Sequence, residues 1–192
     1  MEVDSISVYT DGACKNNGKA TAIAGIGVYF GANDLRNVSE RIPGKQTNNA
    51  AELRAIIRAC EIVQKDMENK IIHVYTDSEY AIKCATTYGS KLQAQKWKSS
   101  KKIPNLELVK KLYILMSSFP NLHIHHVRAH TGRPDIHSVS NAHADRLANQ
   151  AIENPTKIQK ISETIPSHNE SIFSRLTQLE SRLQKIEHVL KM

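Results

Sequence analysis

The first third of the chain contains short segments in which apolar and polar residues alternate, a pattern that predicts β-strands. The alternation runs from Ser5 to Val8, and the first predicted strand extends to Cys14. Two further strands are predicted over 22–30 and 37–42, with turns rich in Gly, Asn and Asp around them. The pattern therefore indicates an antiparallel meander that precedes any helix.

From residue 48 onward, apolar residues recur at helical spacing and alternate with short apolar runs. The first predicted helix covers 48–67, and Thr47 or Asn48 can cap it. The segments that follow are predicted as strands over 71–76 and 122–127 and as helices over 78–88, 106–116 and 141–152. This order of elements predicts an α/β fold.

Two aspartates occupy equivalent places in this pattern. Asp11 and Asp77 each follow an apolar strand and the pair Tyr-Thr, and we expect Asp11 to lie where its strand ends and a tight turn begins at Gly12. If the two strands are neighbours, their carboxylates lie side by side. Adjacent carboxylates repel each other, so such a pair persists most easily around divalent cations.

Each acidic residue also has a simpler explanation when taken alone. Asp11 before Gly12 is a common turn-forming pair. Glu52 and Asp145 are predicted near the starts of their helices, where an acidic side chain complements the helix dipole. The functional interpretation therefore depends on the four residues occurring together.

The composition indicates the kind of partner and the cellular compartment. The 192 residues carry a formal net charge of +7 and a pI near 9.3, which favours a polyanionic partner. Three cysteines without regular spacing imply neither a disulfide framework nor a zinc ribbon. The acidic N-terminus does not resemble a secretory signal, and no apolar run is long enough to span a bilayer. We therefore expect an intracellular, reducing compartment and no membrane association.

A lysine-rich segment surrounds the single tryptophan, Trp97. Its lysines are Lys91, Lys96, Lys98, Lys101 and Lys102. Such a charge run is often only a solvated face. A tryptophan among lysines also fits nucleic-acid binding, because the ring can stack on a sugar or base while the ammonium groups meet phosphates.

Four histidines near the fifth strand suggest a zinc site, which the pattern does not favour. His123 and His125 lie on one face of the predicted strand and His126 on the other, and no cysteine is near. His130 differs because it lies beyond the strand in a loop that contains Gly132.

Taken together, these segments resemble ribonuclease H of type 1 from about Ser5 to Ala151. The matching stretches are Thr10-Asp11-Gly12, 24–28, 47–52, Tyr75-Thr76-Asp77-Ser78, 126–132 and 141–148. Each stretch alone is weak, but all of them in order are highly specific. The resemblance implies a ribonuclease H-like mixed five-stranded sheet of order 3-2-1-4-5 flanked by helices.

The resemblance also implies a chemistry that agrees with the clustered carboxylates. Asp11, Glu52, Asp77 and Asp145 would hold two Mg²⁺ ions, for which Mn²⁺ could substitute, roughly 3.5–4 Å apart. One ion would activate a water and the other would stabilise the leaving 3′-oxygen. His130 matches a mobile loop histidine that assists proton transfer or product release. The expected activity is endonucleolytic hydrolysis of the RNA strand of RNA/DNA hybrids to 5′-phosphate and 3′-hydroxyl products.

Substrate contacts follow from the same resemblance. Residues that match contacts to ribose 2′-hydroxyls and the minor groove are Cys14, Asn16, Asn17, Asn48 and Asn49. Residues that match a pocket for a phosphate of the DNA strand are Lys45, Thr47 and Asn105. Trp97 and Lys98 belong to the lysine-rich segment, which matches a basic protrusion of cellular members.

Two other functions compete with this one. The first is a non-catalytic module that binds RNA/DNA hybrids on the same fold, which would not need four carboxylates together. The second is a nuclease or recombinase that acts on DNA through a related sheet. The asparagines that match 2′-hydroxyl contacts argue against this second alternative.

The C-terminal residues form a separate predicted unit. Residues 1–154 would be the catalytic domain, 155–166 a polar linker and 167–192 an amphipathic, coiled-coil helix. Apolar residues follow a 4-3 spacing at Ile172, Leu176, Leu179, Leu183, Ile186 and Leu190. The helix is expected to assemble homo-oligomers. Pairing with a partner protein, docking on the catalytic domain or a frayed tail also fit the spacing.

Overall fold

The computed structural model describes residues 4–129 and 134–153. His130, the predicted linker and the predicted C-terminal helix lie outside the described residues. Among the described helices, none combines the length and the apolar character needed to cross a membrane.

The five strands form one mixed sheet of order β3-β2-β1-β4-β5, which confirms the predicted topology. Strands β1, β2 and β3 pair antiparallel, whereas β4 and β5 run parallel to β1. The strands are β1 (Ser5–Lys15), β2 (Ile23–Tyr29), β3 (Val38–Arg41), β4 (Ile71–Thr76) and β5 (Leu122–His126). Parallel strands need long crossover connections, and helices provide them here.

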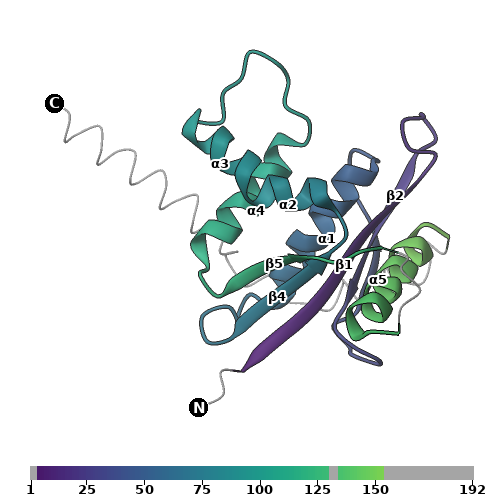
Figure 1. The fold of residues 1–192 in the computed structure, drawn as a ribbon. Helices are drawn as coiled ribbons and strands as arrows, with labels where there is room; N and C mark the ends of the chain where they lie inside the picture. Colours follow the sequence, from purple (N-terminus) through teal and green to yellow (C-terminus); the bar gives the residue numbers. More distant parts are fainter. Residues whose placement is uncertain (1–3, 130–133, 154–192) are drawn as a thin grey trace, which may run out of the picture. The chain divides into compact units, whose positions relative to one another are not determined.

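Helices cover both faces of the sheet (Figure 1). On one face lies α1 (Asn48–Ile62), against which α4 (Leu106–Ser118) packs, and on the other lies α5 (Ile136–Glu153). The short helices α2 (Glu79–Ala85) and α3 (Thr87–Ala94) connect β4 to α4. The core between the sheet and the α1 face contains the fully buried side chains of Val8, Leu53, Ile56, Val74 and Leu112.

Glycines set how closely the helices approach the sheet. A Cβ atom added to Gly12 would lie 2.8 Å from the Cα of Glu52 in α1. One added to Gly27 would lie 2.7 Å from the backbone nitrogen of Ala148 in α5. Both distances are too short for real Cβ contacts, so the missing side chains allow α1 and α5 to lie directly against β1 and β2.

Several predicted boundaries are wrong. Helix α1 ends at Ile62 and turns follow it, whereas the pattern extended it to residue 67. The single helix predicted over 78–88 is two helices, which meet at Thr86 in a non-helical conformation. Helix α5 begins at Ile136 and not at residue 141, because Asp135 Oδ1 accepts hydrogen bonds from the backbone nitrogens of His137 and Ser138 and so caps the first turn.

Candidate active site

Three carboxylates from distant parts of the chain meet at one place. One oxygen each from Asp11, Glu52 and Asp77 lies within 4.8 Å of the other two. Asp11 comes from β1, Glu52 from α1 and Asp77 from the residue after β4. The sheet and α1 thus bring together three of the four predicted metal ligands.

The register of β1 and β4 explains the position of the two aspartates. Their parallel pairing ends at Thr10 and Thr76, and Asp11 and Asp77 are the residues that directly follow this last pair. The expected turn at Asp11 and Gly12 is wrong, whereas the strand predicted to reach Cys14 is present: β1 continues along β2 to Lys15. What ends at Asp11 is the pairing with β4, and this leaves space beside β1 for the carboxylates.

Glu52 reaches the same space from α1. It is the fifth residue of that helix, and no acidic residue lies in the first turn, so the helix-dipole explanation does not hold for it. The close contact of the α1 backbone with Gly12 brings Glu52 beside Asp11. Only 6% of Glu52 is exposed. Its Oε1 accepts a hydrogen bond from Asn48 Nδ2 at 3.4 Å, and within the described part of the chain its buried Oε2 has no partner.

Asp145, on α5, lies close enough to Asp11 to raise the pKa of the Asp11 carboxyl. It is the tenth residue of the helix, and the first turn contains no acidic residue, so the helix dipole does not explain it either. Asp11 pairs with Gly27, the glycine against which α5 packs, so its side chain lies on the α5 side of the sheet. Asn149 Nδ2 donates to Asp145 Oδ1 at 2.9 Å and holds that carboxylate.

The protonation of these residues reflects their crowding. Burial, followed by repulsion from Asp77 and Asp145, raises the pKa of Asp11 from an ordinary 3.8 to about 7. Burial, followed by repulsion from Asp11 and Asp77, also raises the pKa of Glu52 well above its ordinary value. No Lys or Arg among the described residues forms an ion pair with any of the four carboxylates.

This arrangement fits divalent cations. A cation would replace the protons that Asp11 and Glu52 otherwise need, and it would give the unpartnered Glu52 Oε2 a ligand bond. Carboxylate oxygens are the ligands that hard divalent cations prefer. The site therefore indicates dependence on divalent metal.

The sequence interpretation gave no role to Asn141. This residue is 3% exposed, and its Nδ2 donates to Asp77 Oδ2 at 3.1 Å. Its own Oδ1 is buried without a partner in the described residues. Asn141 lies one helical turn before Asp145 on α5, so the two polar side chains share a face of the helix. This spacing of four residues in the sequence could have indicated that Asn141 belongs to the site.

The two segments predicted to contact the minor groove lie next to each other. The backbone nitrogen of Asn48 donates to Asn17 Oδ1 at 3.3 Å, which joins the turn after β1 to the start of α1. Asn16 adopts a left-handed conformation with φ 56° in this turn. Cys14 is half-buried, whereas Asn16, Asn17 and Asn49 are exposed. Because Asn48 also contacts Glu52, this surface adjoins the carboxylates.

The residues predicted to hold a DNA phosphate have separate local partners. Thr47 caps α1 by accepting a hydrogen bond from the Ala50 backbone nitrogen at 3.3 Å. Asn105, in a left-handed conformation before α4, donates to Tyr80 Oη at 3.4 Å. Lys45 is exposed. Within the described residues, no hydrogen bond joins Lys45 or Thr47 to Asn105.

Trp97 fixes the lysine-rich segment to the domain. The half-buried ring lies edge-on to Tyr113 of α4, with the ring centroids 5.9 Å apart. Its backbone nitrogen donates to the Leu92 carbonyl at 2.8 Å. The surrounding lysines, Lys98 among them, are exposed. Trp97 therefore supports the loop that presents these charges.

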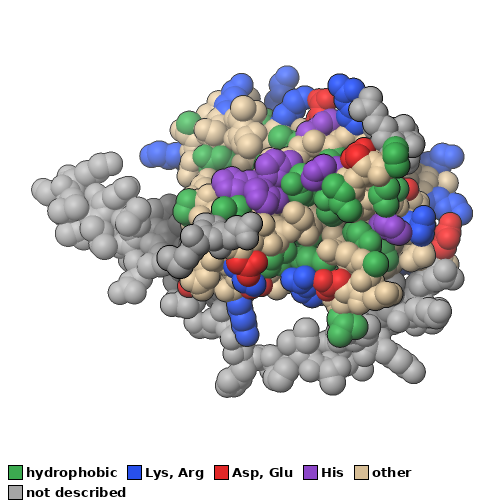
Figure 2. All heavy atoms as spheres, turned by 60° about the horizontal axis from the view of Figure 1, so that its bottom comes forward, with side chains coloured by type: hydrophobic (Ala, Val, Ile, Leu, Met, Phe, Trp, Pro, Cys, Tyr) green, Lys and Arg blue, Asp and Glu red, His purple; other side chains and the backbone are tan. Residues whose placement is uncertain are grey.

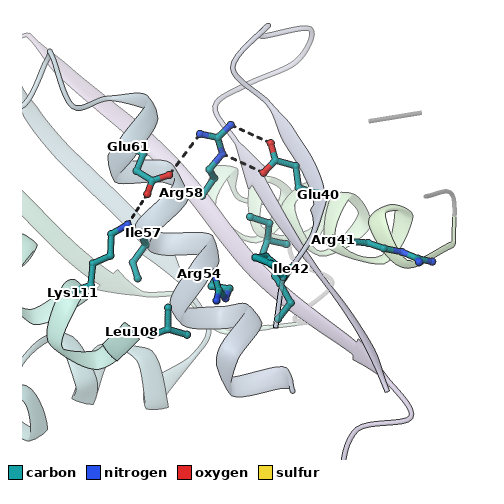
Figure 3. Close-up of a pocket in the computed structure, with 11 residues that line it drawn as sticks. Glu40, Arg41, Ile42, Arg54, Ile57, Arg58, Glu61, Leu108 and Lys111 are labelled. Atoms are coloured by element: carbon teal, nitrogen blue, oxygen red, sulfur yellow. Dashed lines mark hydrogen bonds and ion pairs between the residues drawn. The ribbon is translucent and has the colours of Figure 1, made fainter. Parts of the chain in front are cut away.

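A cavity of about 310 Å³ lies elsewhere, between α1, α4 and the strands β2 and β3 (Figure 3). None of the four carboxylates lines it. Two acidic and four basic residues line it, and both acids are paired: Arg58 bridges Glu40 and Glu61 at 3.1 and 3.7 Å, and Lys111 contacts Glu61 at 2.8 Å. This cavity is therefore not part of the carboxylate site.

Comparisons with known proteins agree with the geometry. The family model described as RNase H matches residues 4–153. Ribonuclease H1 of Homo sapiens is 37% identical over 149 residues, and ribonuclease H of Schizosaccharomyces pombe is 40% identical over 144; these matches cover 77% and 73% of this chain. The chain spans about half the length of these two curated relatives, 50% of each. The solved structure of LC11-RNase H1, isolated from compost, is 30% identical with a TM-score of 0.55, and the match covers 79% of this chain and 98% of that one.

Proposed function

Since the chain belongs to the RNase H family, we propose that it is a metal-dependent endonuclease that hydrolyses the RNA strand of RNA/DNA hybrids. The products would carry 5′-phosphate and 3′-hydroxyl ends. The observation that carries this proposal is the meeting of Asp11, Glu52 and Asp77, with Asp145 beside Asp11. The relatives named ribonuclease H support the reaction class.

The residues of the site would divide the work as follows. Asp11, Glu52, Asp77 and Asp145 would hold two Mg²⁺ ions, or Mn²⁺ in their place. When bound, such ions activate water and stabilise charge on a leaving oxygen. Asn141 would orient Asp77, and Asn48 would orient Glu52. His130 remains a proposed aid to proton transfer or product release.

The hybrid would be recognised beside the carboxylates. Asn16, Asn17 and Asn49 are exposed on the surface that adjoins Glu52 and would contact the minor groove, where 2′-hydroxyls distinguish RNA from DNA. Lys45, Thr47 and Asn105 would hold a phosphate of the DNA strand. Trp97 and Lys98, with the other lysines of the segment, would extend the contact along the backbone.

A non-catalytic hybrid-binding module explains the carboxylate site poorly. Burying several acidic groups without a compensating cation is costly, and a module that only binds a polyanion gains nothing from negative charge on its surface. The raised pKa of Asp11 expresses that cost. A cation-dependent reaction explains why the carboxylates lie together.

The direct test is cleavage of an end-labelled RNA/DNA hybrid with and without Mg²⁺, beside duplex DNA and duplex RNA of the same sequence. We expect cleavage of the RNA strand of the hybrid alone, dependent on the ion. Hybrid binding without cleavage would favour the non-catalytic module. Equal cleavage of duplex DNA would favour a DNA-directed nuclease.

We also propose that 167–192 form a coiled coil, joined by the linker 155–166 to the catalytic domain of 1–154, and assemble homo-oligomers. The unbroken 4-3 spacing supports this proposal. Several catalytic domains could then engage one long hybrid and bind it more tightly through effective concentration. Light scattering of the full chain against a chain ending at Asn154 tests it. A monomeric full-length mass at micromolar concentration would contradict self-association and favour a partner protein.

A further inference from the structure

A cluster of histidines lies on the sheet face away from α1, outside the carboxylate site. His73 on β4 and His123 and His125 on β5 point to the same face, because side chains alternate along a strand and His73 pairs directly with His123. His137, near the start of α5, lies beside them through ring contacts with Tyr75 and Tyr9. Figure 2 shows histidine side chains gathered in one patch of the surface.

Few of the described residues cover this part of the face. Helix α5 packs mainly against β1, β2 and β3, so the β4–β5 side of the same face has little helical cover. Accordingly His123 is exposed, and His73 and His125 are half-buried. None of the described elements has to unfold for an ion to reach the three rings.

The rings are already close to the arrangement of metal ligands. His73 Nδ1 lies 2.9 Å from His125 Nε2, so one nitrogen donates to the other and at least one lone pair faces its neighbour. Two imidazole nitrogens bound to one tetrahedral zinc at about 2.0–2.1 Å are separated by about 3.3 Å. If the two rings moved slightly apart, an ion could therefore bind between the two nitrogens.

His123 would supply a third ligand once its ring turns, because the described histidines do not yet form a group of three with ligand nitrogens within 4.8 Å of one another. Its ring centroid is 5.7 Å from that of His73 and 6.5 Å from that of His125, while His73 and His125 are 5.0 Å apart. Because His123 is exposed, its ring can turn towards the pair at little cost. Burial, followed by the neighbouring histidines, lowers the pKa of His125, which favours the neutral ring that a metal requires.

We propose that His73, His123 and His125 form a site for a borderline transition-metal ion such as Zn²⁺, with the fourth position open to water. Three imidazoles suit zinc, copper or nickel, whereas the carboxylates suit hard ions such as Mg²⁺. The two sites therefore select different metals. The sequence alone argued against zinc because His126 faces away from His123 and His125 and no cysteine is near. The third ligand proposed here comes from β4, 50 residues before His123.

An ion at this site would link the edge strand β5 to β4. Strand β5 is five residues long and lies at the edge of the sheet that the described residues form, where it pairs with β4. Metal binding to the folded state alone stabilises that state. We therefore expect Zn²⁺ to raise the Tm of the protein through the three histidines.

The test is a Zn²⁺ titration of the full-length protein in millimolar Mg²⁺, which keeps the carboxylates occupied. Imidazole ring signals are followed by NMR and heats by calorimetry. We expect the ring signals of His73, His123 and His125 to shift with one equivalent of Zn²⁺. His73→Gln and His125→Gln should each weaken this binding at least tenfold and abolish the rise in Tm. His126→Gln is the matched control, since it changes the same residue type on the opposite face of β5, and it should leave binding unchanged.

Two results would overturn the proposal. One is that the three ring signals do not move while other histidines, such as His168 or His188, shift instead. The other is equal affinity in wild type and in His125→Gln. The wild-type ring signals alone decide the first result, so a variant that fails to fold does not leave the question open.

Discussion

The carboxylate site and the lysine-rich segment both suit a polyanionic substrate, yet they are built in opposite ways. Asp11 and Glu52 are buried, each only 6% exposed, Asp77 and Asp145 are half-buried, and repulsion among these carboxylates raises the pKa of Asp11 and Glu52. The lysines around Trp97 are exposed, with Lys91 in α3 and the others in the segment that follows it. Charges that repel at short range need a partner that neutralises them, whereas exposed charges are already solvated. The first region is therefore suited to hold reactive ions and the second to attract a long nucleic acid.

The largest effect should come from removing one charge of the carboxylate site. Asp77→Asn keeps the size of the side chain but removes a ligand charge, and we expect turnover of the hybrid in Mg²⁺ to fall by roughly 1,000-fold or more. The measurement is single-turnover cleavage at saturating enzyme. Glu107→Gln, which removes an exposed acid from the first turn of α4, is the matched control and should retain full activity. Near-normal turnover in Asp77→Asn would remove Asp77 from the reaction.

A smaller loss of activity should follow when Asp77 keeps its charge but loses the hydrogen bond from Asn141. Asn141→Ala deletes the donor that holds Asp77 Oδ2, and outer groups of this kind typically contribute about 10–100-fold to metal affinity or activity. We expect a higher Mg²⁺ requirement together with slower turnover, measured as rate against Mg²⁺ concentration. Gln150→Ala, an exposed amide on the same helix, should change neither quantity. An unchanged Mg²⁺ requirement in Asn141→Ala would leave Asn141 with a packing role only.

The carboxylate site should also make stability depend on pH. Asp11 titrates near 3.8 in an unfolded chain and at about 7 in the folded protein, so the folded state holds more protons between these values. The free energy of unfolding of the metal-free protein should therefore fall as pH rises from about 4 to 7, by at most about 4 kcal/mol from Asp11. Urea unfolding in EDTA at pH 5 and pH 8 measures it. Asp11→Asn should flatten the dependence, and an equally steep dependence in that variant would assign it to other groups.

The smallest effect on chemistry should come from the lysines. Changing Lys96, Lys98, Lys101 and Lys102 to Gln should weaken hybrid binding and lower its salt dependence, by about 0.9 in the logarithmic slope for each phosphate that the protein no longer neutralises. The rate at saturating enzyme should stay the same. Lys65→Gln, which removes one exposed lysine beyond α1, is a single-charge control outside the segment and should leave the slope unchanged. An unchanged salt slope would mean that the segment is only a solvated face.

Local sequence patterns predicted the helices and strands. Which residues pair across the sheet could be seen only in the structure. The limits of β4 are as predicted because its alternation is clean and bounded by turns. The first strand was predicted to reach Cys14, yet a turn was also expected at Asp11 and Gly12, since Asp-Gly is a turn signal that pairing with β2 overrides. The early start of α5 depends on the cap at Asp135, and the helix prediction began at a later polar residue.

The same distinction holds for the functional residues. Asp11 and Asp77 could be predicted as neighbours, because each follows a strand that ends in the same short pattern. Asn141 could not be assigned to Asp77, 64 residues away in the chain, without the packing of α5. The histidine cluster was invisible for the same reason, since His73 joins His123 and His125 only through the register of β4 and β5.

The central claim is that the carboxylates form one cation site, and the titration of Asp11 tests this most directly. Carbon-13 NMR of the aspartate carboxyls, in EDTA and in saturating Mg²⁺, follows that titration in the wild-type protein. We predict that the carboxyl of Asp11 titrates with a pKa near 7 in EDTA and that Mg²⁺ lowers this pKa, because the ion displaces the proton. The same titration curve in both conditions would contradict the account.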